Sequence, residues 1–188
     1  MADLSTLKDS KANRVPSWNL AKEVMSRGAR IYPLEDLNTL YECVQCGTCV
    51  GSCPSGRRTA LRIRSMIRGI QMGYREEVLD TNDLWSCTTC YTCQERCPRD
   101  VRVTEIVKIV RNIAFEEGRA KERHLVVANN FIKTGHTIPL NEEGKKTRVK
   151  LGLSPVPPTS LLFPEALAEI QEIMRTDGFY NKVIRDKK

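Results

Sequence analysis

Apolar residues recur at three- and four-residue steps along most of the chain, a pattern typical of amphipathic helices. It predicts helices over residues 17–27, 34–42, 57–73, 104–117 and 119–134, and a further helix that starts at Pro164. Glycines stand where four of these helices should end: Gly28, Gly73, Gly118 and Gly135. Thr104 stands where one should begin, as a helix cap. Strand-like alternation is weak throughout, so we expect a mainly α fold.

All eight cysteines fall in two copies of one motif. The first copy is Cys43-x-x-Cys46-x-x-Cys49-x-x-x-Cys53-Pro54, and the second is Cys87-x-x-Cys90-x-x-Cys93-x-x-x-Cys97-Pro98. Bacterial ferredoxins use this spacing, in which three thiolates of a motif bind one [4Fe–4S] cluster and the fourth binds the other. The spacing therefore predicts two clusters, with the following ligands: Cys43, Cys46, Cys49 and Cys97 for the first cluster, and Cys87, Cys90, Cys93 and Cys53 for the second.

Zinc and disulfides are the alternative uses of so many cysteines. Structural zinc sites usually show C-x-x-C pairs separated by a longer stretch, whereas here three cysteines recur at one interval, twice, before Cys-Pro. The sequence starts without a basic region followed by an apolar stretch, so we expect no signal peptide and a reducing compartment, which disfavours disulfides. The motif therefore favours iron–sulfur ligation and a cytoplasmic protein.

The composition excludes some classes of function but does not indicate one. Charged residues make up 28% of the chain and hydrophobic residues 40%, as in an ordinary globular protein. The apolar runs are far shorter than the roughly 20 residues that span a bilayer, so we expect no membrane segment. The formal net charge is +7, but each oxidised cluster with its thiolates carries about −2, which leaves about +3 and weakens any argument for nucleic-acid binding.

The helix pattern and the motifs together predict three parts. Residues 1–32 form an N-terminal arm with one helix, and residues 1–15 of it look disordered. Residues 33–135 form an α-helical ferredoxin-like domain with two [4Fe–4S] clusters. Residues 136–188 contain a loop of low regularity, a proline-rich tether and a C-terminal helix. That last helix presents Leu167, Ile170, Ile173 and Met174 on one face, either to its own domain or to a partner's groove.

The sequence lacks the groups that substrate chemistry would need. No thiol lies outside the two motifs, and four cysteines per cluster leave no open iron position. Neither G-x-G-x-x-G nor G-x-x-x-x-G-K-[ST] is present, so no nucleotide site is indicated. The chain alone is therefore predicted to be non-catalytic and to relay electrons between partners.

The two motifs and the helices between them resemble the α-helical ferredoxin modules, and most closely the iron–sulfur C subunits of the methanogen CoB–CoM heterodisulfide reductases. The resemblance implies an electron conduit from an A-type subunit, which contains flavin and iron–sulfur clusters, to a B-type subunit with Cys-Cys-Gly sites, which reduces the CoM–S–S–CoB disulfide. A hydrogenase or formate dehydrogenase is a further candidate partner. The chain lacks both the C-x4-C-x2-C domain of succinate dehydrogenase relatives and the Cys-Cys-Gly segment of fused relatives. The alternative is a relay component of another cytosolic oxidoreductase, in sulfur or 2-hydroxy-acid metabolism; a redox-sensing regulator is a distant third.

Residues around the motifs carry weaker signals. The arginine-rich stretch 57–68 is a solvated helix face, a surface for docking a partner or tuning the nearby cluster's potential, or, least favoured, a nucleic-acid-binding surface. Trp85 and Tyr91 either shield the second cluster from water or pack in the core. Glycines near the first motif should let N–H groups approach the sulfurs of the first cluster, namely Gly47, Gly51 and Gly56. The two histidines, His124 and His136, are expected to be structural.

Overall fold

The computed structural model describes residues 16, 19–56 and 63–184 of the chain. Every regular element in these ranges is a helix, which confirms the predicted mainly α fold. None of the described helices is long and apolar enough to cross a membrane. The backbone forms two compact units, unit 1 with residues 1–119 and unit 2 with residues 120–188. The division into three parts drawn from the sequence remains a proposal.

Unit 1 holds both cysteine motifs among short and medium-length helices. The α-helices and 3₁₀ helices (η) of its described part are α1 (Asn19–Gly28), α2 (Leu34–Asn38), η2 (Thr39–Glu42), α3 (Thr48–Ser52), α4 (Ile63–Met72), α5 (Arg75–Leu79), η3 (Asn82–Ser86), α6 (Thr92–Glu95) and α7 (Val103–Glu116).

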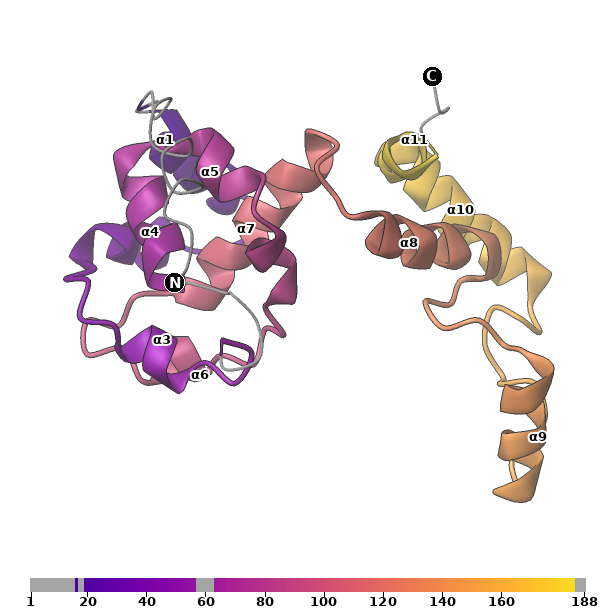
Figure 1. Cartoon of the computed structure of the whole chain (residues 1–188). Coiled ribbons are helices and arrows are strands. Elements are labelled where there is room, and N and C mark those ends of the chain that lie inside the picture. The colour runs from indigo at the N-terminus through magenta and orange to yellow at the C-terminus, as the bar shows by residue number, and fades with distance from the viewer. Residues whose placement is uncertain (1–15, 17–18, 57–62, 185–188) are drawn as a thin grey trace, which may run out of the picture. The chain divides into compact units, whose positions relative to one another are not determined.

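The second half of unit 1 repeats the first, 44 residues later, as the step from Cys43 to Cys87 shows. Each half has a 3₁₀ helix before its motif, a short α-helix inside the motif and a longer α-helix after it. Leu40 in η2 and Leu84 in η3 occupy matching places, and both are fully buried. The motif helices α3 and α6 contact each other and lie side by side at one end of unit 1 (Figure 1). The sequence repeat is therefore also a structural repeat.

Helix α7 lies at the centre of the core of unit 1. It contacts α1, α5, α6 and η3, and its apolar residues are almost completely buried: Ile106, Val107, Ile109, Val110, Ile113 and Ala114. Burying an aliphatic side chain of this size contributes roughly 1.5–3 kcal/mol. Because α7 starts six residues after Cys97, its packing fixes the position of the end of the second motif.

Several predicted helices are confirmed. Helices α1, α7 and α10 (Pro164–Thr176) lie where the apolar periodicity places them, and α8 (Glu122–Thr134) ends at Gly135 as predicted. The helix predicted over 34–42 is an α-helix followed by a 3₁₀ helix. Helix α4 covers the later part of the helix predicted over 57–73, since 57–62 lie outside the described residues. Residues 1–15, which look disordered in sequence, lie outside them as well.

Two sequence predictions about local structure are wrong. Thr104 does not cap α7, because the helix already begins at Val103 and the Thr104 side chain is buried toward Cys93. The loop predicted after Gly135 contains a helix, α9 (Glu142–Lys150). It has no buried residue and hence no apolar periodicity. Its helical state is favoured instead by the Asn141 cap, whose side chain accepts a bond from the Gly144 N–H (2.8 Å), and by acidic residues in the first turn and basic ones in the last.

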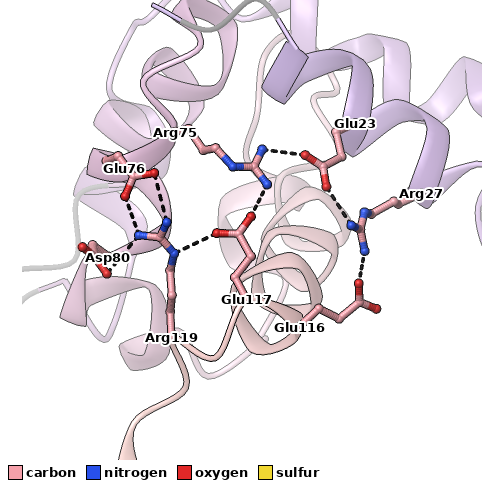
Figure 2. Close-up of polar contacts among 8 residues, drawn as sticks. All are labelled: Glu23, Arg27, Arg75, Glu76, Asp80, Glu116, Glu117 and Arg119. Carbon is pink, nitrogen blue, oxygen red and sulfur yellow. Dashed lines mark hydrogen bonds and ion pairs between the residues drawn. The ribbon is translucent and has the colours of Figure 1, made fainter. Parts of the chain in front are cut away.

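Ion pairs join α1, α5 and α7 at the C-terminal end of α7 (Figure 2). Arg75 of α5 contacts Glu23 of α1 (2.5 Å) and Glu117. Arg119 contacts Glu117 (2.8 Å), Glu76 (2.7 Å) and Asp80 (3.1 Å). Exposed pairs contribute little singly, but this set is shared between arginines that each bind more than one carboxylate. It holds together the end of unit 1 that lies farthest along α7 from the cysteines.

Unit 2 has little buried apolar surface. It contains α8, α9, α10 and α11 (Phe179–Val183), of which α10 and α11 pack on α8. Ile132 and Met174 are its buried hydrophobic residues among those described. The Gln171 side chain donates to the Ile132 carbonyl (3.0 Å) and joins α10 to α8. Ile173, one of the four apolar residues of the α10 face, is 67% exposed, so packing within unit 2 covers that face only in part.

A substitution at Gly28 tests the close packing of α1 on α7. A Cβ added at Gly28 would lie 2.5 Å from both Ile109 Cδ1 and Leu37 Cδ1, which are buried and have little room to move. Overpacking of this kind costs about 1–3 kcal/mol. We therefore expect Gly28→Ala to lower the Tm of helical unfolding by about 2–12 °C in anaerobic circular dichroism. Gly51→Ala is the matched control, because nothing lies within 4 Å of its added Cβ; equal Tm values for the two variants would contradict the packing argument.

Candidate iron–sulfur site

The eight cysteines line two cavities, four to each. The first cavity is lined by Cys43, Cys46, Cys49 and Cys97, together with Arg64, Ile67 and Val101 among others. The second cavity is lined by Cys53, Cys87, Cys90 and Cys93, together with Ile63, Tyr91 and Thr104 among others. Each cavity thus takes three cysteines from one motif and the fourth from the other. The structure brings together the same two sets of four that the spacing predicts, and their assignment as cluster ligands remains a prediction.

The backbone turns sharply inside each motif, at matching positions. Gln45 (φ 59°) and Gly47 (φ 87°) adopt left-handed conformations in the first motif, and Thr89 (φ 53°) and Tyr91 (φ 63°) do so in the second. These turns direct successive thiols of one motif to the same cavity. Glycine adopts such a conformation without strain, whereas tyrosine does so only when its surroundings hold it.

Lys108 of α7 provides that support for Tyr91. Its ammonium lies 4.7 Å from the centre of the Tyr91 ring and also donates to the Tyr91 hydroxyl. Tyr91 lines the second cavity, and the shielding of that site by its ring remains a prediction. Trp85 is half-buried and packs against the core, and the Arg111 guanidinium lies 5.9 Å from its ring centre.

N–H and O–H groups of the described residues approach the sulfurs of both cavities. In the first, Gln45 Nε2 donates to Cys43 Sγ (3.3 Å), and the Thr48 hydroxyl lies 3.4 Å from Cys46 Sγ. In the second, the Gly56 N–H donates to Cys53 (3.3 Å) and the Thr89 N–H donates to Cys87 (3.4 Å). The Cys90 thiol donates to the Thr92 hydroxyl (3.4 Å), and the Thr104 hydroxyl lies 3.6 Å from Cys93 Sγ. Gly56 therefore serves the second set of thiols rather than the first, for which the sequence predicts it.

The pKa values of the thiols depend on how deeply each thiol is buried. Burial, together with the charge of nearby Cys93, raises the pKa of Cys49 to about 11. Burial also raises the pKa of Cys93. The hydroxyls of Thr48 and Thr92 lower the pKa values of Cys46 and Cys90, which are exposed. Each cavity thus has one exposed thiol, Cys46 or Cys90, and iron binding would release the protons of the thiols that ligate it.

Four cations among the described residues approach the cavities. Arg64 of α4 and Arg99 line the first cavity, and both are exposed. Lys108, at the matching position of α7, lies beside Tyr91 of the second. Arg111, also on α7, is half-buried and donates to the backbone carbonyls of Cys87 (2.5 Å) and Leu84 (2.9 Å). In the arginine-rich stretch, Arg68 is exposed, while Arg57, Arg58 and Arg62 lie outside the described residues.

Sequence reasoning missed Thr48, Thr92, Thr104, Lys108 and Arg111. The repeat itself signals two of them, because a threonine precedes the third cysteine in both motifs. The others depend on how α7 folds back over the second motif. The histidines play no part in either cavity: His136 Nε2 lies 2.5 Å from the Thr159 hydroxyl in unit 2.

The chemistry of the two cavities fits iron–sulfur ligation. Each offers four thiols and no other metal-binding side chain among its lining residues. Hydrogen-bond donors surround sulfurs that would carry negative charge as thiolates, as the surroundings of a metal site require. The residues of this chain can thus hold one cluster in each cavity.

Comparisons with known proteins agree with this chemistry. Residues 39–101 match the family of 4Fe–4S dicluster domains. The chain is 48% identical to the C subunit of the H(2):CoB-CoM heterodisulfide,ferredoxin reductase of Methanothermobacter marburgensis, over 93% of this chain and 92% of the relative. It is 46% identical to the iron–sulfur C subunit of the CoB–CoM heterodisulfide reductase of Methanopyrus kandleri, over 79% and 78%. It is also 46% identical to the C subunit of the ferredoxin:CoB-CoM heterodisulfide reductase of Methanosarcina mazei, over 74% and 86%.

Proposed function

The chain belongs to the family of iron–sulfur C subunits of CoB–CoM heterodisulfide reductases, and we propose that it relays electrons through two [4Fe–4S] clusters to the protein that reduces the CoM–S–S–CoB disulfide. Its role as an iron–sulfur electron-transfer component follows from the family. The number of clusters, the partners on either side and the cytoplasmic location of the complex are parts of the proposal.

The observation that carries the proposal is the sorting of all eight cysteines into two cavities of four. Four thiolates complete the coordination of one [4Fe–4S] cluster, which when bound accepts and releases single electrons. Cys43, Cys46, Cys49 and Cys97 would hold the first cluster, and Cys53, Cys87, Cys90 and Cys93 the second. With every thiol used as a ligand, none is left to attack a disulfide, so the chain itself would only hold the clusters, orient them and limit their contact with water.

The catalytic step must then belong to another chain. The B-type partner with Cys-Cys-Gly sites would accept the electrons, and the A-type partner with flavin and iron–sulfur clusters would deliver them. The names of the relatives state different electron donors, namely hydrogen, formate and ferredoxin. This variety supports a relay that stays the same while the donor, such as a hydrogenase or a formate dehydrogenase, changes.

Serine substitutions test the exchange of the fourth cysteine between the motifs. Cys46→Ser and Cys90→Ser each alter a ligand assigned within its own motif, so they identify the electron paramagnetic resonance signals of the first and second clusters. We expect Cys97→Ser to perturb the signal that Cys46→Ser perturbs, and Cys53→Ser to perturb the signal that Cys90→Ser perturbs, because the fourth thiol lies in the opposite cavity.

The same samples establish the cluster count. The unsubstituted chain, purified without oxygen, should contain about eight iron and eight sulfide per chain. A Cys97→Ser variant that loses only the signal assigned by Cys90→Ser would contradict the exchange, and about two metals without sulfide would favour zinc.

Purification of the native complex tests the proposed partners. We expect the chain to copurify with a Cys-Cys-Gly-containing protein, and its dithionite-reduced clusters to be reoxidised rapidly when CoM–S–S–CoB is added. The readout is the return of visible absorbance near the charge-transfer band of the oxidised clusters. Clusters that stay reduced beside a different dehydrogenase partner would assign the relay to another pathway.

A further inference from the structure

The helices that follow the two motifs differ in charge at several matching positions, and one of these positions lies beside the cavities. Ile67 of α4 lines the first cavity and is almost completely buried. The residue 44 positions later is Arg111 of α7. Its guanidinium donates to the carbonyl of Cys87, a residue of the second cavity, at 2.5 Å. A neutral, apolar side chain beside the first set of thiols is thus replaced by a cation beside the second.

The hydrogen bonds of Arg111 do not by themselves explain its charge. Arg111 Nε donates to the Leu84 carbonyl at 2.9 Å. The matching carbonyl in the first half is that of Leu40, which accepts a 2.8 Å bond from the neutral amide of Gln71. The same backbone group is therefore satisfied by an uncharged side chain in one half and by a cation in the other.

Arg111 has no carboxylate to balance its charge: none of the ion pairs between described residues includes it. A half-buried cation is unfavourable unless a negative charge lies nearby. The Arg111 guanidinium is held beside Cys87 by its hydrogen bond to the Cys87 carbonyl (2.5 Å), so its positive charge would lie next to this ligand once Cys87 is a thiolate. With the second set of cysteines as thiolates around a cluster, their net negative charge would supply the balance.

The cations that line the first cavity are exposed. Water screens the charges of Arg64 and Arg99, and Arg99 is also paired with Glu42 (2.5 Å). In the second cavity, the N–H groups of Gly56 and Thr89 donate to sulfurs, and the hydroxyls of Thr92 and Thr104 lie within reach of two more, to which they can donate once those sulfurs are thiolates. Positive charge and hydrogen bonds to the sulfurs both favour the reduced cluster, which carries one more negative charge.

We infer that Arg111 is a positioning residue that holds the second cluster at a higher reduction potential than the first, so that electrons settle on the second cluster before they leave the chain. The inference rests on the proposed ligand sets. It gives the relay a direction within unit 1, from the Cys46 side to the Cys90 side.

Variants that separate charge from hydrogen bonding test the role of Arg111. Arg111→Gln keeps an amide that can bond a carbonyl, as Gln71 does, and removes the charge. Arg111→Lys keeps the positive charge but loses the guanidinium, whose two N–H groups donate to the separate carbonyls of Leu84 and Cys87. Arg68→Gln removes an exposed arginine that lines neither cavity and serves as the control. The full chain loaded with clusters is titrated with dithionite, and each cluster is followed by its electron paramagnetic resonance signal, assigned with Cys46→Ser and Cys90→Ser.

At a fixed potential, we expect the ratio of reduced to oxidised second cluster to fall about tenfold in Arg111→Gln, equivalent to 59 mV for a one-electron couple. It should change less than threefold in Arg111→Lys and Arg68→Gln. A second-cluster ratio unchanged in Arg111→Gln, or lowered equally by Arg111→Lys, would overturn the inference. Loss of the second cluster in either Arg111 variant would overturn it in favour of a purely structural role.

Iron and sulfide analysis separates this test from the proposed function. An unsubstituted chain with about eight of each and two assigned signals satisfies the premise. Fewer clusters in that chain would refute the two-cluster relay itself, before any potential is compared. Two clusters whose measured potentials place the first above the second would leave the relay intact and overturn only the direction inferred from Arg111.

Discussion

The fourth cysteine of each motif lines the cavity of the other motif, and this exchange is the constraint on which the rest of unit 1 depends. Neither cavity can be completed by one motif alone, since Cys97 lines the first and Cys53 the second. The prolines that follow these cysteines turn the chain toward α4 and α7. The motif helices α3 and α6 must then lie side by side, and the apolar faces of the longer helices must pack on a shared core. The cavities and the core are therefore one cooperative structure.

Much of this arrangement can be predicted from the sequence because it depends on local spacing. The cysteine motifs name the two sets of thiols, and apolar periodicity identifies α7 because that helix is buried on a broad face. Features set by distant parts of the chain cannot be predicted in this way. Thr104 has the sequence context of a helix cap, yet its hydroxyl faces Cys93, because the polar group of a buried residue must find a partner in whatever lies across from it. Helix α9 could not be predicted from apolar periodicity, because it has no buried face and therefore no regular spacing of apolar residues.

The repeat explains how two similar sites come to differ. Both motifs share the backbone turns and the threonine beside the second cysteine, so the framework for holding sulfur is the same in each half. The differences lie in side chains on that framework: Gly47 against Tyr91, and Ile67 against Arg111. Duplication supplies two equivalent sites, and substitution of a few residues around one of them is enough to make their electrostatic environments unequal without altering the fold.

The positions of individual thiols show which part of each site faces solvent and which part faces the other site. Cys46 and Cys90 are exposed, whereas Cys49 of the first set and Cys93 of the second lie near enough to each other that the charge of Cys93 raises the pKa of Cys49. Each set thus reaches from the surface of unit 1 to the other set. A partner that docks at the Cys46 surface and one that docks at the Cys90 surface would be connected through the protein, and neither would need to approach the interior. Because Arg111 places a fixed charge beside the ligand backbone where the matching residue of the described first half is neutral, the two surfaces are not interchangeable, and reversing the roles of the partners would require moving that charge to position 67.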